Sequence, residues 1–141
     1  MRGSHQTLFR DCLMSSNDVE IPLWIYTLPF VRGGRDKGGV DCWGLLVILY
    51  KELMGLDISL KESVDCLDLE GLQKLQERFY EVVEPCFGDT VLLNNLGKPV
   101  HVGFVLNGTE MIHTATENGA VIENFKGAKW RRKVVGFYRT K

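Results

Sequence analysis

The stretch DCWGLLVILYKELMG, residues 41–55, decides the fold of this chain. Its apolar run from Leu45 to Leu49 lies in a segment longer than a usual strand, and Gly55 is a residue type that commonly ends helices. The stretch therefore predicts a buried central helix that begins near Asp41, with Asp41 as the N-cap. Gly44 is the one feature that weakens this prediction, because glycine is a poor helix former.

The residues before this helix predict largely irregular structure. Residues 32–40, RGGRDKGGV, form a glycine-rich loop that leads into the helix. The apolar residues 21–31 carry two prolines, which favour an extended, buried segment over a helix. Residues 6–19 are mixed in character and predict a short opening helix. Residues 1–5, MRGSH, resemble a vector-encoded leader, so they carry no structural weight.

The sequence pattern changes after the central helix. Apolar residues at spacings of three and four over 68–82 predict an amphipathic surface helix. From residue 90 the period becomes two, which predicts five short strands with Asn-Gly turns at 107–108 and 118–119. The expected strands cover residues 90–94, 100–106, 110–115, 120–125 and 133–139. A helix-rich first half followed by antiparallel strands predicts one α+β domain over residues 6–141.

The composition excludes several classes of protein. A length of 141 residues suits one compact domain, and 17 Lys and Arg against 18 Asp and Glu give a net charge of −1. This balance argues against a protein that binds nucleic acid or an anionic membrane surface. No apolar run is long enough to span a membrane, so we expect no membrane insertion. The N-terminus has no charged-then-apolar pattern, so we expect no signal peptide.

The four cysteines are scattered singly, as Cys12, Cys42, Cys66 and Cys86. They form no Cys-x-x-Cys pair and have no histidine at zinc-finger spacing, so we expect no metal site. An even count would allow two disulfides, but no export signal supports an oxidising destination. We therefore expect Cys12, Cys66 and Cys86 to be small buried apolar residues.

Cys42 differs from the other cysteines because it lies where the glycine-rich loop enters the helix. The N–H groups and the positive dipole end of a helix stabilise a thiolate, the reactive form of cysteine. The same N–H groups could bind an oxyanion. Flanking glycines let the backbone approach a substrate closely, which a core cysteine would not need. Single cysteines are more often structural, yet this setting makes Cys42 our candidate nucleophile.

His101 and His113 are candidates for the base and the orienting partner that a thiol nucleophile needs, because they lie on two neighbouring expected strands. A two-residue loop at 107–108 would put them on opposite faces of the sheet. A three-residue loop over 106–108, with Gly108 left-handed, would put them directly opposite each other, with Cβ atoms roughly 5 Å apart. We predict the second register, and histidines on opposite faces would exclude the pair.

These residues resemble the sequence boxes of the NlpC/P60 family of cell-wall peptidases. The segment GGVDCWGL at 38–45 is similar to the family's Asp-Cys-Ser-Gly-Leu box. Gly88-Asp89 with HVGFV at 101–105, and then MIHT at 111–114, are similar to its second and third boxes. The likeness covers roughly residues 24–139. It implies a papain-like α+β fold in which the nucleophile begins a buried central helix packed on an antiparallel sheet.

The resemblance also implies a function. Cys42 would be the nucleophile, His101 the general base and His113 the polar residue that orients His101. The implied reaction is hydrolysis of amide bonds in the stem peptides of bacterial peptidoglycan, commonly the γ-D-glutamyl–diamino acid bond. It proceeds through an acyl-enzyme and needs no metal and no cofactor.

Three further positions bear on substrate binding. Trp43 stands where the family usually has a small residue, so its bulk either reshapes the substrate pocket or packs in the core. Phe30 stands where the family commonly has a tyrosine, and it keeps the ring without the hydroxyl. Asp41 is expected to cap the helix, and its place in the motif also suggests contact with a substrate amine.

The Asp-Cys-Trp-Gly-Leu form, the short chain and the missing signal pattern are similar to phage-tail members of the family. We therefore expect a protein made in the cytoplasm that joins tail-tip proteins in the virion tail and opens the cell wall during infection. The alternatives are another thiol amidase or acyltransferase, a toxin injected into rival bacteria, or a non-catalytic tail-assembly protein. The basic residues at 126–133 are expected to form a solvated loop, with Trp130 packing back on the sheet.

Overall fold

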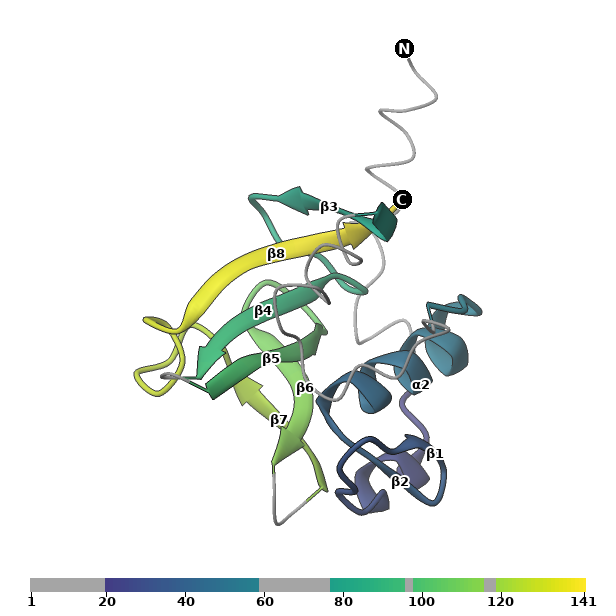
Figure 1. The fold of residues 1–141 in the computed structure, drawn as a ribbon. Coiled ribbons are helices and arrows are strands. Elements are labelled where there is room, and N and C mark those ends of the chain that lie inside the picture. Colours follow the sequence, from purple (N-terminus) through teal and green to yellow (C-terminus); the bar gives the residue numbers. More distant parts are fainter. Residues whose placement is uncertain (1–19, 59–76, 96–97, 116–118) are drawn as a thin grey trace.

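The computed structural model describes residues 20–58, 77–95, 98–115 and 119–141, and in it one helix packs against a six-stranded antiparallel sheet (Figure 1). The strand order is β3-β8-β4-β5-β6-β7. This arrangement confirms the predicted α+β class. The elements are η1, a 3-10 helix (Leu23–Thr27), β1 (Arg35–Asp36), β2 (Gly39–Val40), α2 (Cys42–Met54), β3 (Phe79–Val82), β4 (Thr90–Asn95), β5 (Lys98–Val105), β6 (Glu110–Ala115), β7 (Gly119–Asn124) and β8 (Val134–Thr140).

The five strands predicted from the period-two pattern are confirmed as β4 to β8, with ends that differ from the expected ones by at most about two residues. The predicted helix over 68–82 is wrong at its end, because Phe79–Val82 form β3 and pair with β8. Pairing with a strand far along the chain decides this segment, and local spacing does not report such pairing. Glu77 and Arg78 are helical, as predicted, and the rest of the expected 68–82 helix lies outside the described residues. The expected helix over 6–19 and the leader at 1–5 also lie outside the described residues.

The segment before α2 contains more regular structure than the sequence predicts. Residues 21–31 were expected to be extended, but η1 forms a short helical turn that begins directly after Pro22 and ends before Pro29. Proline at the start of a helix is compatible with its fixed φ, which is −57° at Pro22. The glycine-rich loop includes a small hairpin in which β1 pairs with β2.

Helix α2 is confirmed with the predicted start and end. The Asp41 carboxylate accepts a hydrogen bond from the N–H of Gly44 at 2.8 Å, and Gly55 ends the helix in the left-handed conformation, with φ 68°. A Cβ at Gly44 would lie 2.0 Å from the carbonyl oxygen of Gly34. The glycine-rich loop therefore lies directly against the first turn of α2. No helix in the described part of the chain is long and apolar enough to cross a membrane.

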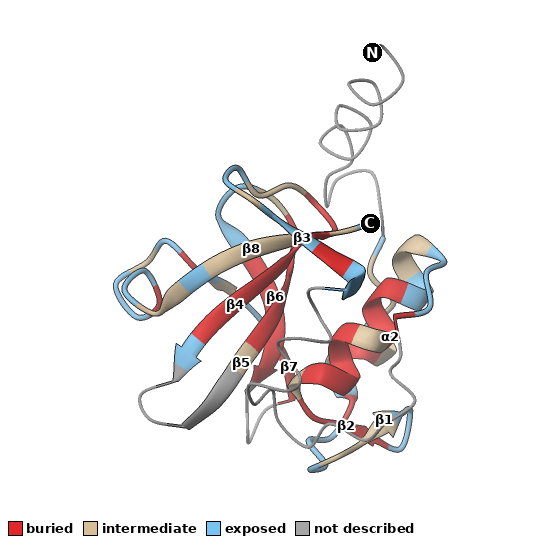
Figure 2. Ribbon diagram, turned by 45° about the horizontal axis from the view of Figure 1, so that its top comes forward, coloured by how far each residue is buried: buried red, intermediate tan, exposed pale blue. Residues whose placement is uncertain are grey.

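The two faces of the sheet pack against different partners, because side chains alternate along each strand. One face packs on α2 through residues such as Leu92, Val102 and Phe104. The other face carries a smaller apolar cluster that includes Leu93 and Met111. Figure 2 shows buried residues along both α2 and the central strands β4, β5 and β6. This division decides which face each functional side chain occupies.

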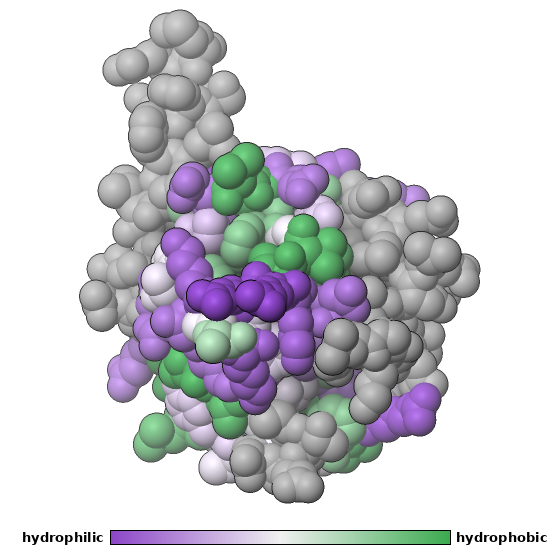
Figure 3. All heavy atoms as spheres, turned by 90° about the vertical axis from the view of Figure 1, so that its left-hand side faces the viewer, coloured by the Kyte–Doolittle hydropathy of each residue, from purple (hydrophilic) through white to green (hydrophobic). Residues whose placement is uncertain are grey.

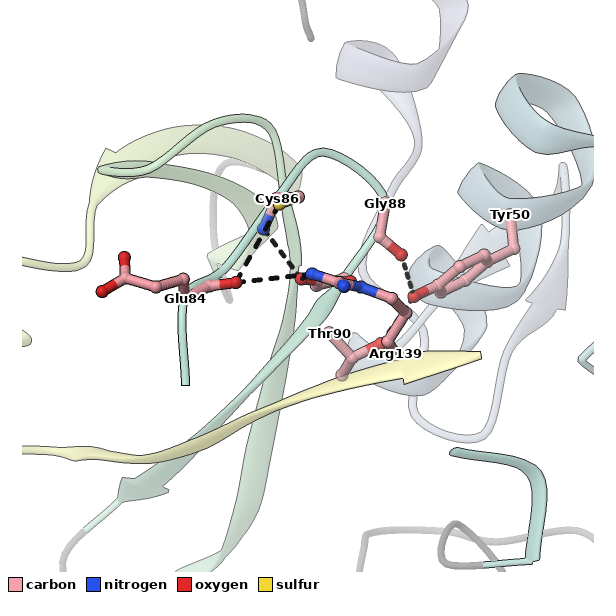
Figure 4. Close-up of polar contacts among 7 residues, drawn as sticks. Tyr50, Glu84, Cys86, Gly88, Thr90 and Arg139 are labelled. Atoms are coloured by element: carbon pink, nitrogen blue, oxygen red, sulfur yellow. Dashed lines mark hydrogen bonds and ion pairs between the residues drawn. The ribbon is translucent and has the colours of Figure 1, made fainter. Parts of the chain in front are cut away.

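A buried polar network joins α2 to the sheet (Figure 4). The Tyr50 hydroxyl donates to the carbonyl of Gly88 and lies 3.0 Å from the Thr90 hydroxyl. Arg139 on β8 binds the Asp89 carboxylate at two points, with Nε 2.8 Å from Oδ1 and Nη2 2.9 Å from Oδ2. Asp89 is 1% exposed and Arg139 is 6% exposed. A two-point, charge-assisted contact of this kind lets both charges be buried.

Cys86 lies beside this ion pair and differs from the expected small buried thiol. It is half-buried and disulfide-bonded, and its N–H donates to Asp89 Oδ2 at 2.8 Å. Spacing along the sequence does not reveal cysteine pairing, which is why the prediction for Cys86 is wrong. The predictions for Cys12 and Cys66 lie outside the described residues.

Candidate active site

Cys42 is the first residue of α2, so its thiol lies at the positive end of the helix dipole. The side chain is half-buried, packs against the core beneath α2 and carries a thiol rather than a disulfide. Helix α2 contacts β5 and β6, the strands that carry His101 and His113. Figures 1 and 2 both show the N-terminal end of α2 as the end nearest the sheet.

Asp41 fixes the loop that leads into this helix. Its side chain binds the N–H of Gly44, the N–H of Gly33 at 3.2 Å and the Nη1 of Arg35 at 2.6 Å. The residue is 4% exposed. The carboxylate is thus held by two backbone donors and a guanidinium. A substrate amine would have to compete with Arg35 to reach it.

Trp43 and Phe30, the other two positions expected to bear on substrate, lie in different surroundings. Trp43 is 2% exposed and belongs to the core cluster beneath α2, as one of its two interpretations required. Phe30 is 38% exposed and forms an isolated bridge with Val40, next to Asp41. Phe30 therefore lies at the surface near the start of α2, where a ligand could reach its ring.

His101 and His113 lie in direct contact, with 2.8 Å between His101 Nε2 and His113 Nδ1. Their expected location on one face of the sheet is confirmed, but the predicted register is wrong. Phe104 pairs with Ile112, so the two histidines are diagonal neighbours rather than directly opposite. The cause is the turn: Asn107 Oδ1 accepts from the N–H groups of residues 109 and 110, both at 2.9 Å. The turn therefore spans 107–109, and Gly108 is not left-handed.

Burial keeps both imidazoles neutral. It lowers the pKa of His101 from 6.5 to about 3, with the neighbouring His113 lowering it further. Burial also lowers the pKa of His113, which is 2% exposed, while its hydrogen bond to Glu123 opposes the shift. At neutral pH each ring therefore has one N–H donor and one lone pair. A neutral His101 is in the protonation state that a general base requires.

Trp130 covers the histidine pair, which confirms that it packs back on the sheet. Its ring stacks on His101 at 6.0 Å between centroids and 17°, and meets His113 edge-on at 5.2 Å and 85°. It is 7% exposed, and its Nε1 has no hydrogen-bond partner among the described residues. The ammonium groups of Lys129 and Lys133 lie over the same ring. Trp130 therefore shields the contact between the imidazoles from water.

The loop that carries Trp130 is otherwise polar, as its basic residues predict. Lys126, Lys129, Arg131 and Arg132 are exposed. Figure 3 shows the side of the molecule on which the connection between β7 and β8 lies, and hydrophilic side chains form a band across the middle of that face. The structure thus agrees with a solvated loop that presents one tryptophan to the sheet.

Glu123 on β7 is a member of this site that the sequence did not predict. Its Oε1 lies 2.8 Å from His113 Nε2, and its Oε2 lies 3.3 Å from Lys129 Nζ. Val121, two residues earlier, pairs directly with His113, so Glu123 projects from the same face. Alternation along 119–124 could have indicated this face, but only after the register between β6 and β7 was known.

The structure thus brings His101, His113, Trp130 and Glu123 together on one face of the sheet. A hydrogen bond joins His101 to His113. His101 pairs with Leu93 on the face away from α2, whereas Cys42 packs with the cluster beneath α2. In the described ranges, no group of three or more His, Cys, Asp and Glu could hold a metal ion.

Sequence comparisons relate the chain to known proteins. A sequence model of a protein family, described as "NlpC/P60 family", matches residues 27–139 of the chain. The chain is 29% identical over 111 residues to the "Probable endopeptidase p60" of Listeria grayi, which is 79% of this chain and 20% of that protein. It is 24% identical over 103 residues to the "Murein DD-endopeptidase MepS/Murein LD-carboxypeptidase" of Escherichia coli strain K12, covering 72% of this chain and 50% of that protein. The chain thus spans a fifth to a half of these relatives.

Two solved structures share the fold. A lipoprotein-like protein of the NLP/P60 family from Staphylococcus aureus superposes with a TM-score of 0.62 at 22% identity, covering 84% of this chain and 38% of that one. The NlpC/p60 domain of the peptidoglycan hydrolase SagA superposes with a TM-score of 0.54 at 24% identity, covering 84% of this chain and 90% of that one. At these identities the likeness concerns the arrangement of helix and sheet.

Proposed function

The chain belongs to the NlpC/P60 family, and we propose on this basis that it is a cysteine peptidase that hydrolyses amide bonds in bacterial peptidoglycan. The observation that carries the proposal is the 2.8 Å contact between His101 and His113 on adjacent strands. It supplies a base with an orienting partner, next to a helix that begins with a thiol. The names of the relatives, an endopeptidase and a murein hydrolase, supply the substrate class.

The reaction begins at Cys42. His101 takes the thiol proton on Nδ1, because its Nε2 is engaged with His113. The thiolate attacks the amide carbonyl carbon, and the backbone N–H groups of the first turn of α2 stabilise the oxyanion. The imidazolium of His101 then gives its proton to the leaving amine, which leaves a thioester on Cys42. Water, deprotonated by His101, hydrolyses the thioester and restores the thiol.

This cycle requires the Cys42 thiol to lie within hydrogen-bond reach of His101 Nδ1. His113 contributes by holding Nε2 of His101, which leaves Nδ1 for the thiol proton. We assign His101 as the base and His113 as its positioning residue.

Digestion of purified muropeptides, with product masses measured, tests this function. Wild-type protein should release fragments whose masses identify the bond, and we propose the γ-D-glutamyl–diamino acid bond. Cys42→Ala should release none, whereas Glu52→Gln, an exposed residue of the same helix, should match wild type. Absence of cleavage by the wild type would support a non-catalytic role instead. Full activity of Cys42→Ala would remove Cys42 as the nucleophile.

We also propose that the protein acts in a phage tail and contacts tail-tip proteins. The Asp41-Cys42-Trp43-Gly44-Leu45 form of the nucleophile box supports this placement. Mass spectrometry of purified virions should then detect the chain at a constant ratio to the tail proteins. Detection of the chain only in the host fraction would contradict the tail placement without affecting the proposed chemistry.

A further inference from the structure

We propose that Glu123 is a positioning residue of the peptidase site, which fixes the tautomer of His113 and, through it, that of His101. The inference rests on the proposed function for its catalytic meaning. Its structural content, a defined position for the single proton of each neutral imidazole ring, stands independently of any activity. Three side chains on three neighbouring strands form the series: His101 on β5, His113 on β6 and Glu123 on β7.

The series starts at the carboxylate. Partial burial by itself would raise the pKa of Glu123, but the hydrogen bonds and charges of His113 and Lys129 lower it below its ordinary value. Glu123 is therefore ionised at neutral pH, and an ionised carboxylate only accepts hydrogen bonds. The 2.8 Å contact between Glu123 Oε1 and His113 Nε2 thus requires the proton to be on His113 Nε2.

The same reasoning then fixes His101. His113 is neutral, so with its proton on Nε2 its Nδ1 carries a lone pair. The 2.8 Å contact between His113 Nδ1 and His101 Nε2 therefore requires a proton on His101 Nε2. Since His101 is also neutral, its Nδ1 is left with the lone pair. Glu123 thus determines, through two imidazoles, which nitrogen of His101 can accept a thiol proton.

The surroundings of the series favour one tautomer over exchange with water. His113 is 2% exposed and Trp130 packs against both imidazoles. Glu123 lies at the edge, with 26% of its side chain exposed, and Lys129 binds its second oxygen. When His101 takes the thiol proton, the negative charge of Glu123 stabilises the imidazolium through His113. A neutral side chain at position 123 would supply neither the tautomer nor the charge.

Nitrogen NMR of the imidazoles in protein labelled with ¹⁵N-histidine tests the inference directly. We would record it in the Cys42→Ala background, where no peptidase activity is needed. We expect a protonated Nε2 and an unprotonated Nδ1 on both His101 and His113. With Glu123→Gln the amide can donate or accept, so we expect a mixture of tautomers at His113. Glu110→Gln, an exposed residue bound to Asn107 in the turn, should leave the spectrum unchanged.

Kinetics of the active protein provide the second readout. Glu123→Gln should lower kcat about tenfold with an unchanged KM, because the substitution disturbs the tautomer and charge support of the base without altering the binding pocket. Glu123→Asp keeps the charge and should recover part of the loss. A proton on His113 Nδ1 in the parent protein, or a Glu123→Gln variant with native tautomers and native kcat, would overturn the inference. An inactive wild type with the expected spectrum would overturn the proposed function alone.

Discussion

Replacement of His113 by alanine tests how strongly the base depends on its partner. The substitution removes the acceptor that lies 2.8 Å from His101 Nε2. Trp130 stacks on His101 and limits the entry of water, so the N–H of His101 loses a partner that water replaces poorly. An unsatisfied buried donor costs about 1–3 kcal/mol. If this cost falls on the transition state, kcat decreases roughly 5- to 150-fold.

The expected signature of His113→Ala is a loss in kcat with little change in KM. His113 is 2% exposed, so it cannot contact a bound peptide directly, and the substitution affects only the base. Steady-state cleavage of a purified muropeptide measures both constants, and thermal unfolding confirms that the variant is folded. His113→Asn keeps an amide oxygen for His101 and should lose less. A raised KM with an unchanged kcat would show that His113 serves substrate binding and does not position His101.

Three further predictions concern stability. Gly44→Ala places a Cβ 2.0 Å from the Gly34 carbonyl oxygen and should cost about 1–3 kcal/mol in urea denaturation; an unchanged midpoint would mean that the loop moves away freely. Asp89→Asn leaves the buried Arg139 charge without its charged partner and should lower the free energy of unfolding by about 3–5 kcal/mol. A decrease of less than about 1 kcal/mol would contradict this prediction. Burial lowers the pKa of His101 from 6.5 to about 3, so the unfolded chain binds more protons between these pH values. Stability should therefore fall as the pH decreases from 6.5 toward 3, and His101→Asn should reduce that slope.

Periodicity predicted the elements of the fold well where packing follows local pattern. The apolar run after Cys42 and the glycine at position 55 were sufficient for α2, and alternation was sufficient for β4 to β8. Pairing over long distances was not predictable. Phe79–Val82 form a strand because β8 lies beside them, and Cys86 is disulfide-bonded although its spacing gives no sign of it.

The candidate site was predicted in part for the same reason. His101 and His113 were expected on one face because a three-residue loop was preferred to a two-residue loop, and the offset of two residues between them was missed. That offset depends on the Asn107 side chain, which moves the turn along the chain. Glu123 was missed because its role requires the register of a third strand. The close packing of Gly44 against the glycine-rich loop is a contact in three dimensions, and the local sequence pattern does not predict it.

In the proposed mechanism His101 activates the thiol of Cys42, and the alkylation rate of Cys42 in the folded protein measures that activation. Iodoacetamide modification at neutral pH, followed at this residue by peptide mass spectrometry, reports how readily the thiol loses its proton. We predict that wild type reacts about tenfold faster than His101→Ala, because His101 accepts the proton as the thiol reacts, whereas a thiol with an ordinary pKa near about 8.5 is only a few per cent ionised at neutral pH. Equal rates in the two proteins would contradict the pairing of Cys42 with His101.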